Sequence, residues 1–309
     1  MPSLRIPHSA LRTLPMSESW TVLRLLTWTT DYLKSHGSES PRLDAEVLLA
    51  HARSCERIML YTAFDQVVDE QVRGKFRELV KRRAEGVPVA YLVGKREFYS
   101  LSFHVTPDVL VPRPETEFVV VAALDALKGS GFGVQGSGPA VVADVGTGSG
   151  AIAVAVAKHA AGVRVVAIDI SAAALAVAKE NAAMHGVAER MEFVEGDLLS
   201  SLAADPTFAV IASNPPYIGE SEIGTLSPSV IQHEPRGALI AGPTGTEVIE
   251  RLIPQAAERL LAGGWLILEV SPLIASRVVE LFAADGRFTP ATVGKDLAGL
   301  ARVVQARRK

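Results

Sequence analysis

Four consecutive residues, Asn214-Pro215-Pro216-Tyr217, form the most chemically specific segment of the sequence. Neither proline has an N–H group, so the backbone here offers carbonyl acceptors and few donors. Asn214 precedes a proline and is therefore held in extended geometry, which fixes the direction of its side chain. Tyr217 adds an aromatic face for stacking a planar group. Asn-Pro pairs also mark ordinary turns, but this combination suits an –NH2 group on a planar system, meaning an amide or an exocyclic base amine.

Such a nitrogen is a poor nucleophile because its lone pair is delocalised. Two acceptors, the Asn214 side-chain oxygen and the Pro215 carbonyl, would hold both hydrogens out of plane and direct the lone pair at an incoming group. No strong base is needed, since the substituted nitrogen is acidic. Asn214, Pro215 and Tyr217 are therefore the predicted catalytic residues, and Pro216 completes the predicted substrate-binding set.

A glycine-rich segment, Gly146-Thr147-Gly148-Ser149-Gly150, follows an apolar run and precedes a helical pattern. Glycines allow a sharp turn and a close approach to a ligand, and the following helix start supplies unpaired N–H groups. All five residues are predicted to bind a cofactor. The segment also fits the dinucleotide pattern G-x-G-x-x-A, so on its own it leaves NAD and S-adenosylmethionine both open.

Three aspartates at the ends of three successive predicted strands separate these interpretations. Asp169 can accept both hydroxyls of a ribose from either cofactor. Asp144 puts negative charge just ahead of the glycine segment, where it would repel a pyrophosphate and attract the ammonium of a methionine moiety. Asp197 suits an adenine amino group. A single strand-end aspartate more often caps a helix, but the three together with the glycines favour S-adenosylmethionine.

These residues need a sheet that brings strand ends together. From residue 140 onward, apolar strands alternate with helical runs, which implies βαβ units and a parallel sheet covered on both faces. Ligands of such sheets bind beyond the carboxyl ends of the strands. We therefore expect an α/β fold with a Rossmann-like sheet. The expected strands are 140–145, 163–170, 191–199, 208–214 and 263–271.

The chain before this sheet shows three other patterns. Residues 1–16 contain three prolines and predict a flexible tail, with Met16 as an alternative start. Residues 17–88 are helical in pattern, with Trp20, Leu23, Leu26 and Leu33 on one apolar stripe and Leu43, Val47, Leu48 and Ala50 on another. We expect a small N-terminal helical domain there, used for substrate recognition.

Residues 89–112 alternate with period two and predict a hairpin connector with a turn at Pro107-Asp108. The remaining 113–309 form the expected methyl-transfer domain, in which Thr116 is predicted to cap a helix. Residues 129–138 hold five glycines and predict a flexible loop. The long connection 218–240 is placed to grip a substrate.

Composition narrows the class of protein. The 309 residues carry a net charge of -3, and without a basic excess no direct nucleic-acid partner is expected. One cysteine and no apolar stretch of about 18 residues favour a reducing, cytoplasmic location without a membrane anchor. The seven histidines lack ligand spacing, so no metal site is expected. We expect a monomer.

The sequence resembles the N5-glutamine methyltransferases, whose hallmark is N-P-P-Y, and most closely the release-factor (HemK-type) members. The resemblance implies a class I S-adenosylmethionine-dependent fold and methylation of the Gly-Gly-Gln glutamine of class 1 peptide chain release factors, in translation termination. It also places Arg96, Glu97 and Phe98 near the cofactor mouth. It is carried by PRLDAEVLLAH (41–51), GKREFYSLSFHV (94–105), LVPRPETE (110–117), DVGTGSGAIAVA (144–155), DIS (169–171), SNPPYI (213–218) and HEPRGALIAG (233–242).

The chain departs from the family pattern at three places. Ala209 replaces a frequent aspartate, and Thr244-Gly245-Thr246 replaces the usual Asp-Gly-Leu. Leu198 stands where a tryptophan or phenylalanine is common, and it is the expected packing contact of the adenine. By the same resemblance, Asn214 is expected to contact the cofactor as well as the substrate.

Four other functions compete with this one. The related enzymes for a ribosomal-protein glutamine share N-P-P-Y, but they differ after LVPR and lack a match to residues 295–302. N6-adenine methyltransferases of DNA or RNA use the same Asn-Pro-Pro-aromatic arrangement on a flipped base. A catalytically silent binding module is disfavoured by the intact motifs. An NAD-dependent dehydrogenase lacks a proton-transfer residue.

Overall fold

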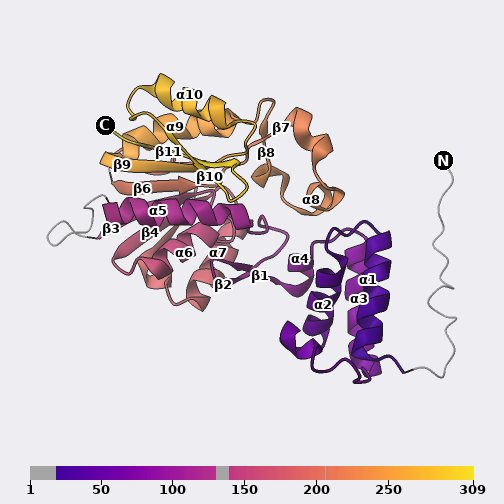
Figure 1. Ribbon diagram of the computed structural model, residues 1–309. Helices are drawn as coiled ribbons and strands as arrows, with labels where there is room; N and C mark the ends of the chain where they lie inside the picture. Colours follow the sequence, from indigo (N-terminus) through magenta and orange to yellow (C-terminus); the bar gives the residue numbers. More distant parts are fainter. Residues whose placement is uncertain (1–18, 130–138, 206) are drawn as a thin grey trace. The chain divides into compact units, whose positions relative to one another are not determined.

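The computed structural model describes residues 19–129, 139–205 and 207–309 (Figure 1). The predicted flexible tail 1–16 and all but the first residue of the predicted loop 129–138 lie outside the described residues. The chain divides into two compact units, Met1–Val93 and Gly94–Lys309. The first unit therefore extends beyond the residue 88 at which the sequence pattern placed its end.

The N-terminal unit is helical. Its elements are α1 (Val22–Ser35), α2 (Pro41–Ala52), η1 (Arg57–Leu60), α3 (Glu70–Ala84) and α4 (Val89–Val93). Two of these helices begin with a capping side chain that accepts from the backbone N–H three residues on: Thr21 for α1 and Asp69 for α3. The helices enclose one apolar cluster that includes Leu26 and Leu48.

Two leucines of the predicted apolar stripes do not belong to this cluster. Leu23 is 43% exposed and Leu43 is 46% exposed. In α1 the buried positions are instead Val22, Leu25, Leu26, Thr29 and Leu33, which follow the helical repeat from one residue earlier. The helical pattern is confirmed, but Leu23 and Leu43 were wrongly placed on the buried stripes, and Val47 is only half-buried and lies outside the cluster.

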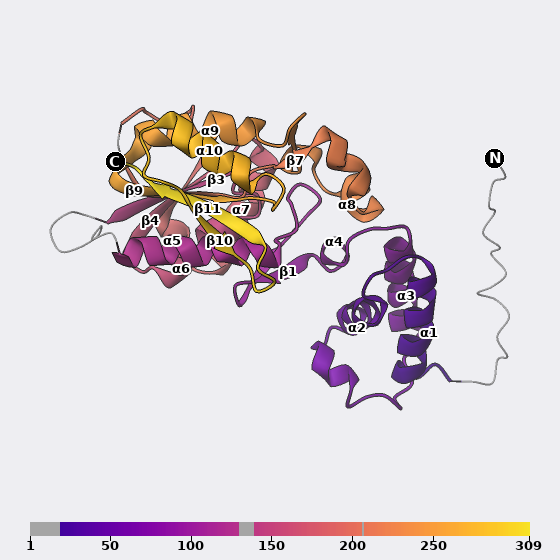
Figure 2. The ribbon, with the colours of Figure 1, turned by 45° about the horizontal axis from the view of Figure 1, so that its top comes forward.

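The second unit, Gly94–Lys309, is built on a seven-stranded sheet with strand order β10-β11-β9-β6-β3-β4-β5. β3, β4, β5, β6 and β9 run parallel, and β11 lies antiparallel between β9 and β10 (Figure 2). The strands are β3 (Ala140–Val145), β4 (Val163–Asp169), β5 (Met191–Glu195), β6 (Phe208–Ser213), β9 (Leu260–Glu269), β10 (Thr292–Lys295) and β11 (Ala301–Arg307). The expected parallel strands are all present, but the antiparallel pair at the C-terminal end was not predicted.

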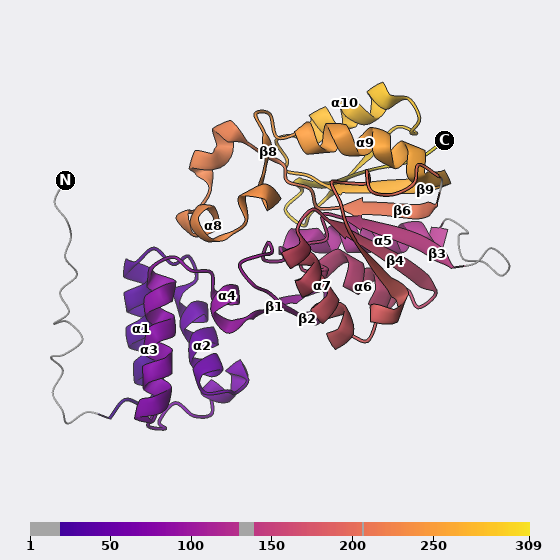
Figure 3. The ribbon, with the colours of Figure 1, turned by 180° about the vertical axis from the view of Figure 1, so that it is seen from behind.

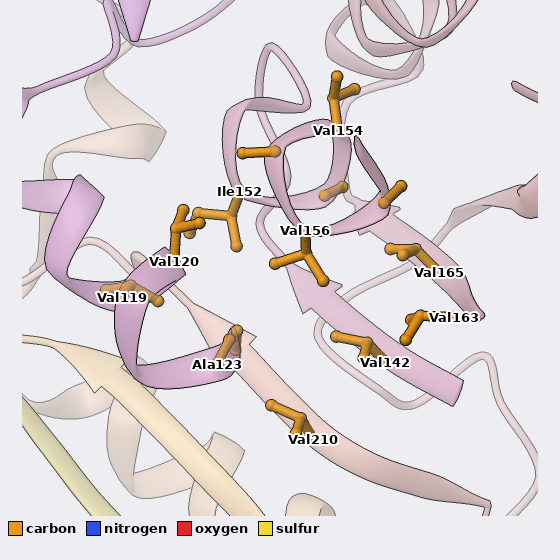
Figure 4. Packing of buried hydrophobic residues seen from close by; sticks show 14 of the residues in the cluster. Val119, Val120, Ala123, Val142, Ile152, Val154, Val156, Val163, Val165 and Val210 are labelled. Carbon is orange, nitrogen blue, oxygen red and sulfur yellow. The ribbon is translucent and has the colours of Figure 1, made fainter. Parts of the chain in front are cut away.

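Helices cover both faces of this sheet. One face is covered by α5 (Glu117–Gly129), α6 (Ala151–His159) and α7 (Ala172–Met184). The opposite face is covered by α9 (Glu247–Arg259) and α10 (Ala275–Asp285) (Figure 3). On the first face, Val119, Val120 and Ile152 lie over Val142 and Val210 of the sheet (Figure 4). None of the helices in the described ranges is long and apolar enough to cross a membrane.

A hairpin precedes the sheet. β1 (Lys95–Phe98) pairs with β2 (Leu101–His104), so the turn of the hairpin is Tyr99-Ser100. Both turn residues have positive φ, 50° and 59°. A two-residue turn of that hand matches the right-handed twist of the paired strands. The predicted turn at Pro107-Asp108 is also present, but it follows the hairpin, and the Val109 N–H donates to the Thr106 carbonyl at 3.2 Å there.

We predict that the sheet core depends on Val142, which is fully buried in β3. Val142→Ala should lower the free energy of unfolding by about 2 kcal/mol, because two methyl groups are lost and a cavity remains. Chemical denaturation measures this change. Val121→Ala, at a position 44% exposed on α5, is the matched control and should shift stability by less than about 0.5 kcal/mol. Equal losses at both positions would contradict the packing described.

Candidate active site

A cavity of about 420 Å³ opens at the carboxyl ends of the parallel strands. Its wall combines residues from the ends of β3, β4, β5 and β6 with the segment before α5 and with α9. Nine of the predicted site residues line it: Gly146, Thr147, Gly148, Ser149, Asp169, Asp197, Leu198, Asn214 and Pro216. Asp144, Gly150, Pro215 and Tyr217, also predicted, are not part of the wall.

The glycine segment turns the chain from β3 into α6. Gly148 has φ of +54°, and its N–H donates to Asp169 Oδ2 at 2.8 Å. Gly150 has φ of +81° at the N-cap of α6, where an added Cβ would lie 3.2 Å from the Ala178 side chain of α7. A side chain at either position would be strained, and at Gly150 it would also push α6 away from α7.

A buried asparagine that the sequence did not single out holds this segment from behind. Asn181 of α7 donates through Nδ2 to the carbonyls of Ser149 (2.8 Å) and His104 (2.9 Å). Its Oδ1 accepts from the His104 N–H at 2.7 Å. Asn181 thereby ties the glycine segment to the β1–β2 hairpin. Its position in mid-helix gives no sequence signal for this role.

Asp144 lies beneath the glycine segment and is completely buried. Its Oδ2 accepts from Thr147 Oγ1 at 2.7 Å and from the Ala153 N–H at 3.0 Å. Its Oδ1 has no hydrogen-bond partner among the described residues. Burial, and to a smaller extent the nearby Asp169, raise the pKa of Asp144 to about 7, against the two hydrogen bonds.

Asp169 and Asp197 both line the cavity, in different surroundings. Asp169 accepts backbone N–H groups of Gly148 and Ser171, while burial raises its pKa above the usual range. Asp197 is half exposed and forms an ion pair with Arg251 of α9. Arg251 is a wall residue that no local sequence pattern indicates. Leu198 beside Asp197 has φ of +55°, an uncommon conformation for a leucine.

Asn214 follows the last residue of β6, and its side-chain amide is held by one hydrogen bond. Nδ2 donates to Thr116 Oγ1 at 3.0 Å, from a residue 98 positions earlier. No donor contacts Oδ1 within the described part of the chain. The predicted capping role of Thr116 is wrong: Thr116 ends a 3-10 turn (Pro114–Thr116), and its buried hydroxyl contacts Asn214 instead.

Tyr217 turns its hydroxyl inward. The Oη donates to Glu269 Oε1, at the end of β9, over 3.1 Å. Burial, and then the charge of Glu269, raise the pKa of Tyr217 well above its usual range, so the phenol stays protonated. The ring packs against the apolar cluster of the α9–α10 face. Stacking of Tyr217 on a substrate remains a prediction.

Arg113 fastens the long connection 218–240 to the segment before α5. Its Nη2 donates to both carboxylate oxygens of Glu234, at 2.7 and 2.8 Å. The Glu234 side chain is only 2% exposed, so the carboxylate depends on this partner. Arg113, Pro235 and Gly237 all line the cavity. The connection thus contributes to the cavity wall.

Arg96, Glu97 and Phe98 lie in β1, and none of them is part of the cavity wall. Phe98 is buried in the core of the α5–α6 face. Their place near the cofactor mouth stays a prediction. The hairpin reaches the cavity only through the residues after it, from Asp108 to Arg113.

Comparison with known proteins agrees with this arrangement. Residues 24–94 match the PrmC N-terminal domain, and residues 134–234 match the Methyltransferase small domain. A release factor glutamine methyltransferase of Rhodopirellula baltica is 52% identical over 289 residues, covering 94% of this chain and 97% of the relative. The chain belongs to the release factor glutamine methyltransferases. It is therefore a methyltransferase.

Further relatives extend this result. A release factor glutamine methyltransferase of Nitratidesulfovibrio vulgaris is 42% identical over 296 residues, covering 95% of this chain and 98% of the relative. A 16S rRNA methyltransferase from T. thermophilus, solved with AdoMet and guanosine, is 19% identical. It covers 70% of this chain and 50% of its own, with a TM-score of 0.50, and shows the fold alone. In this methyltransferase family the N-terminal unit and the sheet unit occur together.

We predict that Asp144 makes stability depend on pH. An acid whose pKa is higher in the folded state binds more protons when folded, so its stabilising contribution is present below its ordinary pKa of 3.8 and is lost as pH rises through about 7. Asp144→Asn keeps an acceptor for Thr147 and Ala153 without the buried charge. It should raise the free energy of unfolding at pH 8 by about 1 kcal/mol.

Urea titrations at pH 6 and pH 8 measure this difference, and the variant should show a flatter pH dependence. Asp125→Asn is the matched control, because Asp125 is 66% exposed on α5. A variant less stable than the wild type at pH 8 would show that Asp144 is needed as a charge in the fold.

Proposed function

We propose that this protein transfers a methyl group from S-adenosylmethionine to N5 of a glutamine side chain. The acceptor is the glutamine of a Gly-Gly-Gln segment in class 1 peptide chain release factors. The orientation of Asn214 is the observation that carries this proposal. Its Nδ2 is engaged by Thr116, which leaves Oδ1 available beside the cavity to accept from an amide N–H.

The residues around the cavity fit the proposed cofactor. The glycine segment offers backbone at close range, and Asp169 and Asp197 offer carboxylates for ribose and adenine. Beneath them, Asp144 Oδ1 is buried without a partner among the described residues, and a cationic ammonium would compensate it. When bound, S-adenosylmethionine supplies an electrophilic methyl group.

The protein's own contribution to transfer is to orient the acceptor. Asn214 Oδ1 and the Pro215 carbonyl accept the two N–H groups of the glutamine amide and turn its lone pair out of conjugation. The lone pair so exposed would receive the methyl group that bound S-adenosylmethionine supplies, and the nitrogen would release one proton to water. The two prolines add no N–H that would compete for these acceptors. This is catalysis by positioning and fixed dipoles.

The choice of acceptor is tested directly. Purified protein is incubated with S-adenosylmethionine carrying a labelled methyl group. Separate reactions contain a class 1 release factor, ribosomal proteins, or DNA or RNA as the acceptor. Label should enter the release factor. Label confined to a ribosomal protein would leave the glutamine chemistry intact with another substrate. Label confined to adenine would assign the protein to the base-modifying enzymes.

We predict that Asn214→Ala lowers kcat by about 100-fold or more while the dissociation constant of the cofactor changes less than about threefold, because the substitution removes an orienting acceptor. Asn214→Asp should be nearly as poor, since it keeps acceptor oxygens but loses the Nδ2 donation to Thr116. Steady-state kinetics and calorimetry separate the two quantities.

Asp169→Ala is the contrasting variant, because Asp169 lies on the cofactor side of the cavity. It should weaken cofactor binding by roughly 1–3 kcal/mol. An Asn214→Ala enzyme with normal kcat, or one that fails only in cofactor binding, would refute the assigned role.

We predict that the N-terminal unit recognises the protein substrate. The chain divides between Val93 and Gly94, and all of the cavity wall lies in the second unit. A protein starting at Gly94 should therefore bind S-adenosylmethionine about as well as the full chain while losing transfer to release factor. Calorimetry and label transfer measure the two properties. Undiminished transfer by the shortened protein would remove substrate recognition from this unit.

A further inference from the structure

Glu269 is a buried carboxyl group behind the segment that begins at Asn214. It is the last residue of β9, only 1% exposed, and β9 lies beside β6 with Leu268 paired to Ser213. The carboxyl thus ends its strand at the level where β6 passes into Asn214. Glu269 forms no salt bridge among the described residues. A buried carboxyl without a cationic partner is costly to keep.

The contacts of Glu269 lead to both polar groups of the segment. Oε1 accepts from the Tyr217 hydroxyl at 3.1 Å. The Thr116 hydroxyl lies close enough to the carboxyl to lower its pKa more than Tyr217 does, but it is not aligned as a hydrogen-bond donor, and Oε2 is buried without a partner among the described residues. Thr116 in turn accepts from Asn214 Nδ2 at 3.0 Å. One carboxyl therefore connects with Tyr217 directly and with Asn214 through a single hydroxyl.

The direction of these hydrogen bonds decides how Asn214 presents its amide. A threonine hydroxyl has one proton and two lone pairs. When the proton of Thr116 points to Glu269, the oxygen can only accept from Asn214, which fixes Nδ2 toward Thr116. Oδ1 must then face the other way. Without an acceptor at position 269, the Thr116 proton is free to donate to Asn214 Oδ1, and the amide can turn over.

We propose that Glu269 is a positioning residue for methyl transfer: acting through Thr116, it fixes the amide orientation of Asn214, and through Tyr217 it anchors the end of the same segment. This inference rests on the proposed function. Glu269 itself is fully buried and is not part of the cavity wall.

Ionised Glu269 accepts from the two hydroxyls better than the protonated acid does, because a protonated carboxyl uses one oxygen as a donor and has less acceptor capacity left. Burial is the largest cause that raises the pKa of Glu269, and Glu115 raises it too. Thr116, Tyr217 and Arg302 lower it, and the resulting pKa is about 7. Arg302 is itself paired with Asp296. An acid with a raised pKa is ionised above that value. The wild-type kcat should therefore fall as pH drops through about 7.

The test compares wild type with Glu269→Gln at pH 8, using release factor as substrate. The glutamine has the same shape but brings an N–H2 donor toward the two hydroxyls. We expect kcat to fall 10- to 100-fold, with the KM for release factor and the dissociation constant of S-adenosylmethionine within about twofold. The melting temperature should not fall, because a buried charge is removed. Glu280→Gln, 66% exposed on α10, is the matched control and should match wild type.

Thr116 provides the second arm. Thr116→Val removes the hydroxyl at constant shape, whereas Thr116→Ser keeps it and should retain clearly more activity. In the Thr116→Val background, Glu269→Gln should cost less than it does alone, because the connection to Asn214 is already broken. The fall in kcat near pH 7 should also flatten in Glu269→Gln.

Three results would overturn the inference: wild-type kcat in Glu269→Gln, a loss that follows cofactor affinity or melting temperature, or strictly additive effects with Thr116→Val. If the wild type transfers no methyl group to release factor, the proposed function fails instead. The same variants are then compared on the acceptor that the wild type does methylate, so that the two failures are distinguished.

Discussion

The hydrogen bond from Asn214 Nδ2 to Thr116 Oγ1 is the interaction on which the proposed chemistry of this site depends. A side-chain amide has a donor end and an acceptor end of nearly the same shape, so its orientation must be set by its neighbours. Here the donor end is engaged from within the protein, and the acceptor end is left for a ligand. Asn214 follows β6 at the centre of the sheet, and Thr116 lies in the turn before α5. The packing of these two elements brings the two residues together.

Burial of carboxyl groups is the second constraint on the site. Asp144 lies one residue before the end of β3 under the glycine segment, and Glu269 ends β9 behind Tyr217. Each has one oxygen lacking an aligned partner among the described residues. Both have a pKa raised to about 7 by burial. Two apolar clusters, one on each face of the sheet, stabilise a fold that keeps these costly groups. Local unfavourable terms of this kind are expected at functional sites.

Features that depend on neighbouring residues in the chain were predicted correctly from the sequence. The parallel strands, the glycine turn and the strand-end aspartates follow from periodicity and residue type, and the structure has the cavity where strand ends meet. Contacts between distant segments were missed. Thr116 looks like a helix cap in its own segment, and its partner is 98 positions away. Asn181 and Arg251 carry no local signal. The antiparallel strand β11 is defined by its pairing with β9, and β10 by its pairing with β11.

The central claim is that the protein methylates one glutamine amide nitrogen. The most direct measurement is tandem mass spectrometry of release factor after reaction with S-adenosylmethionine. If the protein has the proposed activity, the glutamine of Gly-Gly-Gln gains one CH2 on its side chain. Release factor incubated without the protein gains none. A methyl group on any other residue, or on adenine in place of the release factor, would contradict it.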